Sequence, residues 1–212
     1  ARAIVLKPKL LLLDEPLSNL DAKLRKELRA EFLKIHSLSG ATTIFVTHDL
    51  EEAFSISDRV ALMNQGCVEQ FASPVDMFRR PETPFVAEFI GHSNMIGGKV
   101  ATNSSGRFIP FGSGQVRVTS DLPDGRDIRL AVPAHLIRVA KEPSCSDNSF
   151  PVRIRTTSYL GATVRYELDF GFMSLHAEVP AHVDVPIFRP GDHAIACWQA
   201  SDVIPLPSEA AP

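Results

Sequence analysis

Three side chains in the first quarter of the chain are of the types that act on phosphate groups. Asp14 and Glu15 directly follow four consecutive leucines, and His48 follows a second apolar run. A carboxylate can hold a metal ion near a phosphate, and a second carboxylate can act as a base or orient a water molecule. An imidazole can stabilise charge on the terminal phosphate. These residues therefore predict metal-assisted transfer of a phosphoryl group to water, with Asp14 on the metal side and Glu15 as the base.

The elements that must position these residues are predicted to be a strand, a helix and a second strand. Residues 10–14 form a short apolar run, typical of a strand buried on both faces of a parallel sheet. Apolar residues then recur every three or four positions from Leu20 to Leu38, which predicts an amphipathic helix that ends near Gly40. Residues 42–46 are rich in β-branched side chains and predict the second strand. Because parallel strands bind ligands at their carboxyl edge, we expect the carboxylates and the imidazole to converge there.

A structural interpretation exists beside the chemical one for each of these residues. Asp14 and Glu15 can simply end a strand, and His48 can be a hydrogen-bonded histidine at a strand end. The segment from Ser18 to Asp21 can be the N-terminus of the helix, with Asn19 or Asp21 as its capping residue. The chemical interpretation is favoured because His48 returns to the same sheet edge one strand–helix–strand unit after the carboxylates.

The composition and the pattern of apolar residues change after Gly91. Before it, the patterns predict a helix over about residues 49–56, a hairpin that turns at Gln65-Gly66, and two short helices that each start with a hydroxyl cap and a proline. After it, glycine, proline and alternating residues predict short antiparallel strands in one or two small barrels. The predicted fold is an α/β domain over residues 1–91, followed by an all-β domain over residues 92–212.

Composition limits the classes of function. The net charge of the 212 residues is −3, and no basic cluster occurs from residue 92 onward, so nucleic acid is not an expected partner. No run approaches the roughly 20 apolar residues of a membrane helix, so any membrane contact is expected to go through a partner. Cys67, Cys145 and Cys197 form no C-x-x-C pair, which indicates a reducing compartment and no zinc site.

Together these motifs resemble the nucleotide-binding subunit of an ABC transporter. Residues 10–14 are similar to the Walker B strand, Glu15 to the catalytic glutamate, residues 18–21 to the D-loop and His48 to the switch histidine. The run from Glu15 to Arg25 resembles the importer branch that serves sugars, polyamines and ferric iron. The resemblance implies that the first domain is the C-terminal part of a P-loop NTPase sheet of the RecA-like class. The implied activity is ATP hydrolysis that drives import.

The resemblance also implies cofactors and partners. ATP and Mg²⁺ are the cofactors, with Asp14 holding the metal through water and with Ser18 and Asp21 contacting nucleotide, beside the catalytic Glu15 and His48. The implied partners are a second ATPase subunit, membrane permease subunits and, indirectly, an extracytoplasmic substrate-binding protein. The implied location is peripheral, on the cytoplasmic face of the membrane.

The resemblance continues past Gly91. Residues 85–96 look like the junction into the transport-associated OB domain (TOBE) of those importers, and they favour polyamine or ferric iron as the imported substrate. Trp198 lies where the pattern of that domain would put it. Residues 131–135 depart from the pattern, because relatives tend to carry an Arg-Pro-Glu segment there. We therefore expect an OB-like barrel in residues 92–212.

Segments that ATP binding requires do not occur in these 212 residues. There is no G-x-x-x-x-G-K-S/T loop, and Gly97-Gly98-Lys99 is followed by Val100 where a hydroxyl is required. Residues 1–3 resemble the tail of the helix after the family's signature sequence. We therefore expect an N-terminally truncated chain that alone neither binds ATP tightly nor hydrolyses it. Two alternatives stay open, a non-transport ABC ATPase and a C-terminal module that binds a small regulatory ligand.

Overall fold

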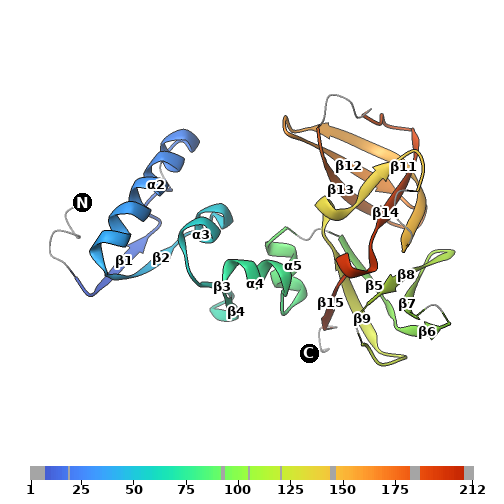
Figure 1. The fold of residues 1–212 in the computed structure, drawn as a ribbon, viewed down its shortest axis with the longest axis horizontal. Coiled ribbons are helices and arrows are strands. Elements are labelled where there is room, and N and C mark those ends of the chain that lie inside the picture. The colour runs from blue at the N-terminus through green and yellow to red at the C-terminus, as the bar shows by residue number, and fades with distance from the viewer. Residues whose placement is uncertain are drawn as a thin grey trace. The chain divides into compact units, whose positions relative to one another are not determined.

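The chain is mostly β-structure with few helices (Figure 1). It divides into two compact units, residues 1–78, here called the N-terminal unit, and residues 79–212, here called the β unit. No helix in the described part of the chain is both long and apolar enough to cross a bilayer. The helix tail predicted at residues 1–3 lies outside the described part. The computed structural model describes residues 8–18, 20–91, 94–104, 106–119, 121–143, 147–181 and 187–207.

In the N-terminal unit, one long helix connects two strands that pair with each other in parallel. This order along the chain confirms the predicted strand, helix and strand. β1 (Leu10–Asp14) and β2 (Thr42–Val46) pair in parallel, with Asp14 opposite Val46. α2 (Ala22–Ser39) connects them (Figure 1). The carboxyl ends of both strands therefore lie at one edge of the pair.

Local side-chain chemistry sets both ends of α2. The carboxylate of Asp21 accepts the backbone N–H groups of Lys23 and Leu24 at 3.1 and 3.0 Å, so Asp21 is the N-cap. The other predicted cap, Asn19, lies outside the described residues. At the C-terminal end, Gly40 has a φ of 63°, a left-handed conformation that glycine adopts without strain and that ends the helix.

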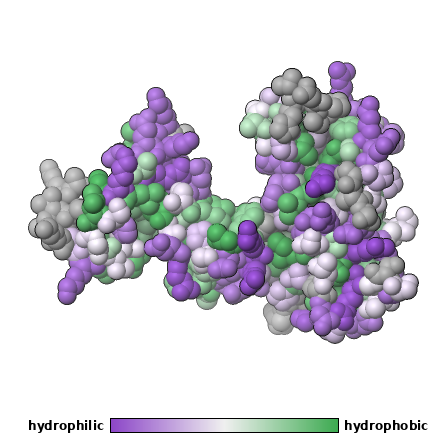
Figure 2. Space-filling view, viewed as in Figure 1, coloured by the Kyte–Doolittle hydropathy of each residue, from purple (hydrophilic) through white to green (hydrophobic). Residues whose placement is uncertain are grey.

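One face of the β1–β2 pair is covered and the other is not. Leu11 is 8% exposed, on the face where Phe32 of α2 contacts Phe45 with ring centroids 5.8 Å apart. On the opposite face, here called the open apolar face, four side chains are at least 50% exposed: Leu10, Leu12, Ile44 and Val46. Figure 2 shows hydrophobic surface in the N-terminal unit. Within the described residues, the prediction that the first strand is buried on both faces is therefore wrong, because α2 covers only one face.

A short helix and a hairpin follow in the N-terminal unit. Asp49 caps the helix by accepting the backbone N–H of Glu52 at 3.1 Å. The hairpin turns at Gln65 and Gly66, whose φ angles of 47° and 83° suit a tight two-residue turn, so the predicted hairpin is confirmed. These elements, and the helix that crosses into the next unit, are α3 (Leu50–Ile56), β3 (Val60–Asn64), β4 (Cys67–Ala72) and α4 (Pro74–Arg79).

The β unit begins with the rest of α4, followed by α5 (Pro84–Phe89), which is capped by the hydroxyl of Thr83. Short 3₁₀ turns occupy Ala134–Leu136 and Ala200–Asp202. The strands are β5 (Asn94–Lys99), β6 (Ala101–Asn103), β7 (Gly106–Phe111), β8 (Gly114–Val118), β9 (Asp127–Val132), β10 (Arg138–Ala140), β11 (Asn148–Tyr159), β12 (Thr163–Asp169), β13 (Ser174–Pro180), β14 (His193–Trp198) and β15 (Ile204–Pro207).

These strands form antiparallel sheets in the orders β10-β14-β11-β12-β13, β15-β9-β5 and β6-β7-β8. The sheets share one hydrophobic core, in which Ile109, Leu168 and Trp198 are at most 1% exposed. The predicted strand-rich character is thus confirmed. Gly97-Gly98-Lys99 lies inside β5, so this sequence forms part of a sheet and not a phosphate-binding loop.

α5 belongs to the β unit although it precedes the change in sequence texture. Its Ala87 packs with Ala131 of β9 and Leu206 of β15, and all three are at most 1% exposed. Residues 131–135, where the sequence departs from the family pattern, form the end of β9 and the start of a 3₁₀ turn. The division into domains at residue 91 stays a prediction.

Candidate active site

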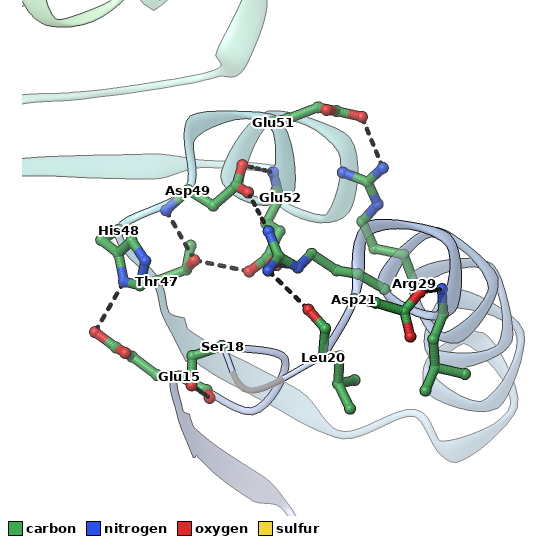
Figure 3. Close-up of polar contacts among 12 residues, drawn as sticks. Glu15, Ser18, Leu20, Asp21, Arg29, Thr47, His48, Asp49, Glu51 and Glu52 are labelled. Carbon is green, nitrogen blue, oxygen red and sulfur yellow. Dashed lines mark hydrogen bonds and ion pairs between the residues drawn. The ribbon is translucent and has the colours of Figure 1, made fainter.

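Glu15 and His48 lie together at the carboxyl ends of β1 and β2 (Figure 3). Nδ1 of His48 is 3.1 Å from Oε1 of Glu15. The backbone N–H of Glu15 donates to the carbonyl of Val46 at 2.9 Å, which extends the parallel pairing, and a φ of 43° at Glu15 then turns the chain. The Glu15 and His48 side chains are 46% and 73% exposed, so solvent and a ligand can reach both. The prediction that the Glu15 carboxylate and the His48 imidazole lie close together is therefore confirmed, and their roles in a reaction stay a prediction.

Asp14 ends β1 as an exposed side chain. Within the described ranges, no group of three or more His, Cys, Asp or Glu side chains gathers as a metal site would require. A single carboxylate nevertheless suits Mg²⁺, which keeps several water molecules and takes other ligands from substrate phosphates. Asp14 therefore fits the predicted role of holding Mg²⁺ through water beside a bound nucleotide.

Ser18 and Asp21 shape the loop between β1 and α2. The hydroxyl of Ser18 donates to the backbone carbonyl of Glu15 at 3.0 Å, which closes a turn directly after the strand. Asp21 uses Oδ1 to cap α2. The structural interpretation of Asp21 is therefore confirmed. The nucleotide contacts expected of both residues stay a prediction.

The sequence patterns did not indicate a polar network beside His48. Its centre is Arg25 of α2, which lies one helical turn after the N-cap. Nη1 of Arg25 donates to Oδ2 of Asp49 at 3.1 Å, and Nη2 donates to the carbonyl of Leu20 at 3.0 Å. Nε of Arg25 lies 3.5 Å from Oε1 of Glu52. A guanidinium suits this arrangement because its donors are fixed in a fork.

Glu52 is the buried member of this network, with 3% of its surface exposed. Its Oε2 accepts the hydroxyl of Thr47 at 2.7 Å, and the Thr47 oxygen accepts the backbone N–H of Asp49 at 3.0 Å (Figure 3). The residues on both sides of His48 are therefore held by side chains of the network. The sequence signal that could have indicated this network is a basic residue one turn into α2, Arg25, together with acidic residues at the start of the next helix.

The pKa of Asp49 reflects its place in the network. Partial burial raises this pKa, but the backbone N–H groups of Glu52 and Glu51 and the charge of Arg25 lower it by more. The net result is a pKa below the ordinary value of 3.8. Asp49 is therefore ionised at neutral pH and remains a charged acceptor for Arg25.

Comparison with curated proteins finds relatives that align over most of this chain. The spermidine/putrescine import ATP-binding protein PotA of Trichodesmium erythraeum is 37% identical, with 80% of this chain and 47% of that protein covered. The sulfate/thiosulfate import ATP-binding protein CysA 1 of Chromobacterium violaceum is 38% identical, with 88% and 51% covered. The Fe(3+) ions import ATP-binding protein FbpC of Agrobacterium fabrum is 35% identical, with 80% and 47% covered. The chain spans about half the length of these relatives.

No protein-family model matches the chain. Among solved structures, the cytoplasmic molybdate-binding protein ModG is similar at a TM-score of 0.46 and 18% identity, over 53% of this chain and 94% of that one. The three curated relatives named above share one description, import ATP-binding protein, and differ in the substrate that their names give.

Proposed function

We propose, from homology to the ATP-binding subunits of ABC importers, that this chain supplies the catalytic edge of such a subunit. Its curated homologues are subunits of that family at 35 to 40% identity over most of the chain. The observation that carries the proposal is the 3.1 Å contact between His48 and Glu15 at the ends of two parallel strands. This contact supports hydrolysis of ATP as the reaction, with both side chains open to the nucleotide.

In this proposal, Glu15 and His48 act on two parts of one hydrolysis reaction. Glu15 orients the attacking water and takes its proton, as a general base does. In the form that carries a proton on both ring nitrogens, His48 donates its Nδ1–H to the Glu15 carboxylate and its Nε2–H to an oxygen of the γ-phosphate, where negative charge develops. Asp14 would hold Mg²⁺ through water, and bound Mg²⁺ supplies neutralisation of phosphate charge. Ser18 and Asp21 contact nucleotide from the loop that precedes α2.

The anchor for the phosphates lies outside these 212 residues, since they contain no P-loop sequence. We therefore assign ATP binding and hydrolysis to the complete subunit and expect neither from these residues alone. The open apolar face of β1 and β2 supports the proposal that both strands belong to a parallel sheet of the P-loop NTPase class whose second face is covered by elements outside these residues. Parallel sheets in such folds are covered on both faces.

The partners follow from the same assignment. In this proposal the complete subunit works as a dimer of ATPase subunits on the cytoplasmic face of the membrane. The dimer docks on permease subunits, to which an extracytoplasmic substrate-binding protein delivers the imported substrate. Relatives named for polyamines, sulfate and ferric ions align at similar identity, so overall identity favours none of these substrates. Our proposal of polyamine or ferric iron rests on the local resemblance of residues 85–96 to the domain junction of importers for those substrates. We assign residues 92–212 to the OB-like accessory domain, which the shared core of antiparallel sheets supports.

The test is steady-state ATP hydrolysis by the complete protein that carries these residues. Glu15→Gln removes the base and is expected to lower turnover by roughly 10² to 10⁴-fold while ATP still binds. Glu27→Gln is the matched control, because Glu27 is exposed on α2. Unchanged turnover in Glu15→Gln would remove Glu15 from its role. A wild-type protein without any ATP hydrolysis would overturn the proposed function.

A further inference from the structure

We propose that Arg25 is a positioning residue for His48, acting through two carboxylates. The proposal rests on the proposed function, because it concerns the same hydrolysis site. The imidazole of His48 is 73% exposed, and the contact that the structure records for it is with Glu15. Packing therefore does little to fix this side chain, so its place depends on the backbone that carries it.

That backbone is held on both sides of His48. Thr47, directly before it, donates its hydroxyl to the buried carboxylate of Glu52 at 2.7 Å. Asp49, directly after it, accepts Nη1 of Arg25 at 3.1 Å. Because Nε of Arg25 lies 3.5 Å from the Glu52 carboxylate, one guanidinium supports both flanking anchors.

The same guanidinium also reaches the loop that follows β1. Nη2 of Arg25 donates to the carbonyl of Leu20 at 3.0 Å, and Leu20 lies between Ser18 and the cap of α2. Arg25 thus ties the loop that leaves Glu15 to the segment that carries His48. A lysine has one compact ammonium group on a flexible stem, so it does not reproduce the fixed fork with which Arg25 donates to Asp49 and to the Leu20 carbonyl.

A second arginine on α2 provides a matched control. Arg29 lies one helical turn after Arg25 and donates to Glu51 of α3 at 2.7 Å (Figure 3). Its side chain is 12% exposed, so it is at least as enclosed as Arg25, which is 29% exposed. Arg29 therefore joins the same two helices through Glu51, and within the described residues it makes no hydrogen bond or ion pair with residues 47–49. A role in helix packing predicts similar effects for the two arginines, whereas a positioning role predicts different ones.

The experiment measures kcat and KM for ATP in the complete protein with Arg25→Lys and with Arg29→Lys. We expect Arg25→Lys to lower kcat by roughly 10- to 100-fold, since a small displacement of a reacting group costs that much. The KM for ATP should stay within about threefold, because ground-state binding is unaffected. Arg29→Lys should leave both constants near those of the wild type. Equal falls of kcat in the two variants would overturn the proposal.

A second pair of variants keeps the proposal testable if Arg25→Lys fails to fold. Thr47→Val removes the hydroxyl that reaches Glu52, and Thr47→Ser keeps it. We expect a fall in kcat for Thr47→Val and a value within about threefold of wild type for Thr47→Ser. Equal kcat values for these two variants would contradict the proposal.

The outcomes also separate this inference from the proposed function. If the wild type hydrolyses ATP and Glu15→Gln does not, the proposed function stands, and the arginine comparison then decides the positioning role alone. If Glu15→Gln retains full turnover, the assignment of the site itself fails. In a His48→Ala background, Arg25→Lys should lower kcat by less than about twofold further, because the residue it positions is gone. A full additional loss in that background would contradict action through His48.

Discussion

The side chain of Asn94 and the backbone of His176 exchange two hydrogen bonds, although the two residues lie 82 positions apart in the sequence. Nδ2 of Asn94 donates to the His176 carbonyl at 2.7 Å, and Oδ1 accepts the His176 N–H at 2.6 Å. Nδ2 also donates to the carbonyl of Val132 at 2.9 Å. One amide that is 2% exposed therefore connects β5 and β9 of one sheet to β13 of another.

Asn94→Ala should destabilise the β unit by about 2 to 4 kcal/mol, because it leaves backbone groups without partners where water has little access. Denaturant unfolding followed by the fluorescence of Trp198, the single tryptophan, measures this change. The control is Asn103→Ala at an exposed position of β6, which should cost less than about 0.5 kcal/mol. Similar losses in the two variants would show that the amide of Asn94 does not join the sheets.

His48→Ala in the complete protein should lower ATP turnover by roughly 10² to 10³-fold, because a donor to the developing phosphate charge is removed. ATP affinity should change little, since the proposed function places the anchor for the phosphates outside residues 1–212. The measurement is steady-state hydrolysis beside equilibrium nucleotide binding. His193→Ala is the control, as His193 is exposed on β14. Normal turnover in His48→Ala would place His48 outside the reaction.

Asp49→Asn should make stability less dependent on acid pH. Asparagine can still cap α3, but the charged partner of Arg25 is lost, at a cost of about 1 kcal/mol at neutral pH for a pair that solvent partly reaches. The folded-state pKa of Asp49 is lowered, so the stability that it contributes is present above the ordinary value of 3.8 and is lost as pH falls through the folded pKa.

Unfolding free energies of wild type and Asp49→Asn, compared between about pH 7 and about pH 2, test this sign. The difference between the two proteins should shrink as the carboxyl becomes protonated. Asp58→Asn, at an exposed position after α3, should give no such trend. A difference that stays constant over this range would mean that the charge of Asp49 contributes nothing.

The 212-residue chain by itself should not bind ATP with micromolar affinity. It carries the carboxylate proposed for the metal and the base proposed for the water, but its sequence contains no P-loop whose backbone and lysine would cradle phosphates. Calorimetric titration with ATP and Mg²⁺ should therefore give no saturating heat, while the complete protein titrated in parallel should saturate. Micromolar binding by the short chain would require a phosphate anchor among residues 1–212.

Local signals were enough to predict the elements that bring Glu15 and His48 together. Apolar periodicity predicted the order of strand, helix and strand, and Gly40 and the pair Gln65-Gly66 marked the helix end and the hairpin turn correctly. The short distance between the two catalytic candidates follows from these elements, because parallel strands end at a common edge. Their roles in hydrolysis rest on resemblance and still need the experiments above.

Long-range contacts account for what the sequence did not reveal. A charged residue such as Arg25 on an amphipathic helix normally indicates a solvated face, so nothing in its periodicity predicted its hydrogen bonds to Asp49 and the Leu20 carbonyl or its ion pair with Glu52. The placement of α5 in the β unit depends on Ala87 packing against Leu206, a contact across most of that unit's sequence. Exposure on one side of β1 was also unpredictable, since a run of leucines gives no information about which neighbours cover it.

The open apolar face has a consequence for handling the protein. Leu12 of β1 and Ile44 of β2 lie opposite each other on this face. Among the described residues, no further strand pairs with the outer edge of β1 or of β2. Such surfaces favour ribbon-to-ribbon self-association in solution. Residues 1–212 produced in isolation should therefore aggregate at the concentrations used for spectroscopy. A charged substitution on this face, such as Leu12→Lys, should reduce that aggregation.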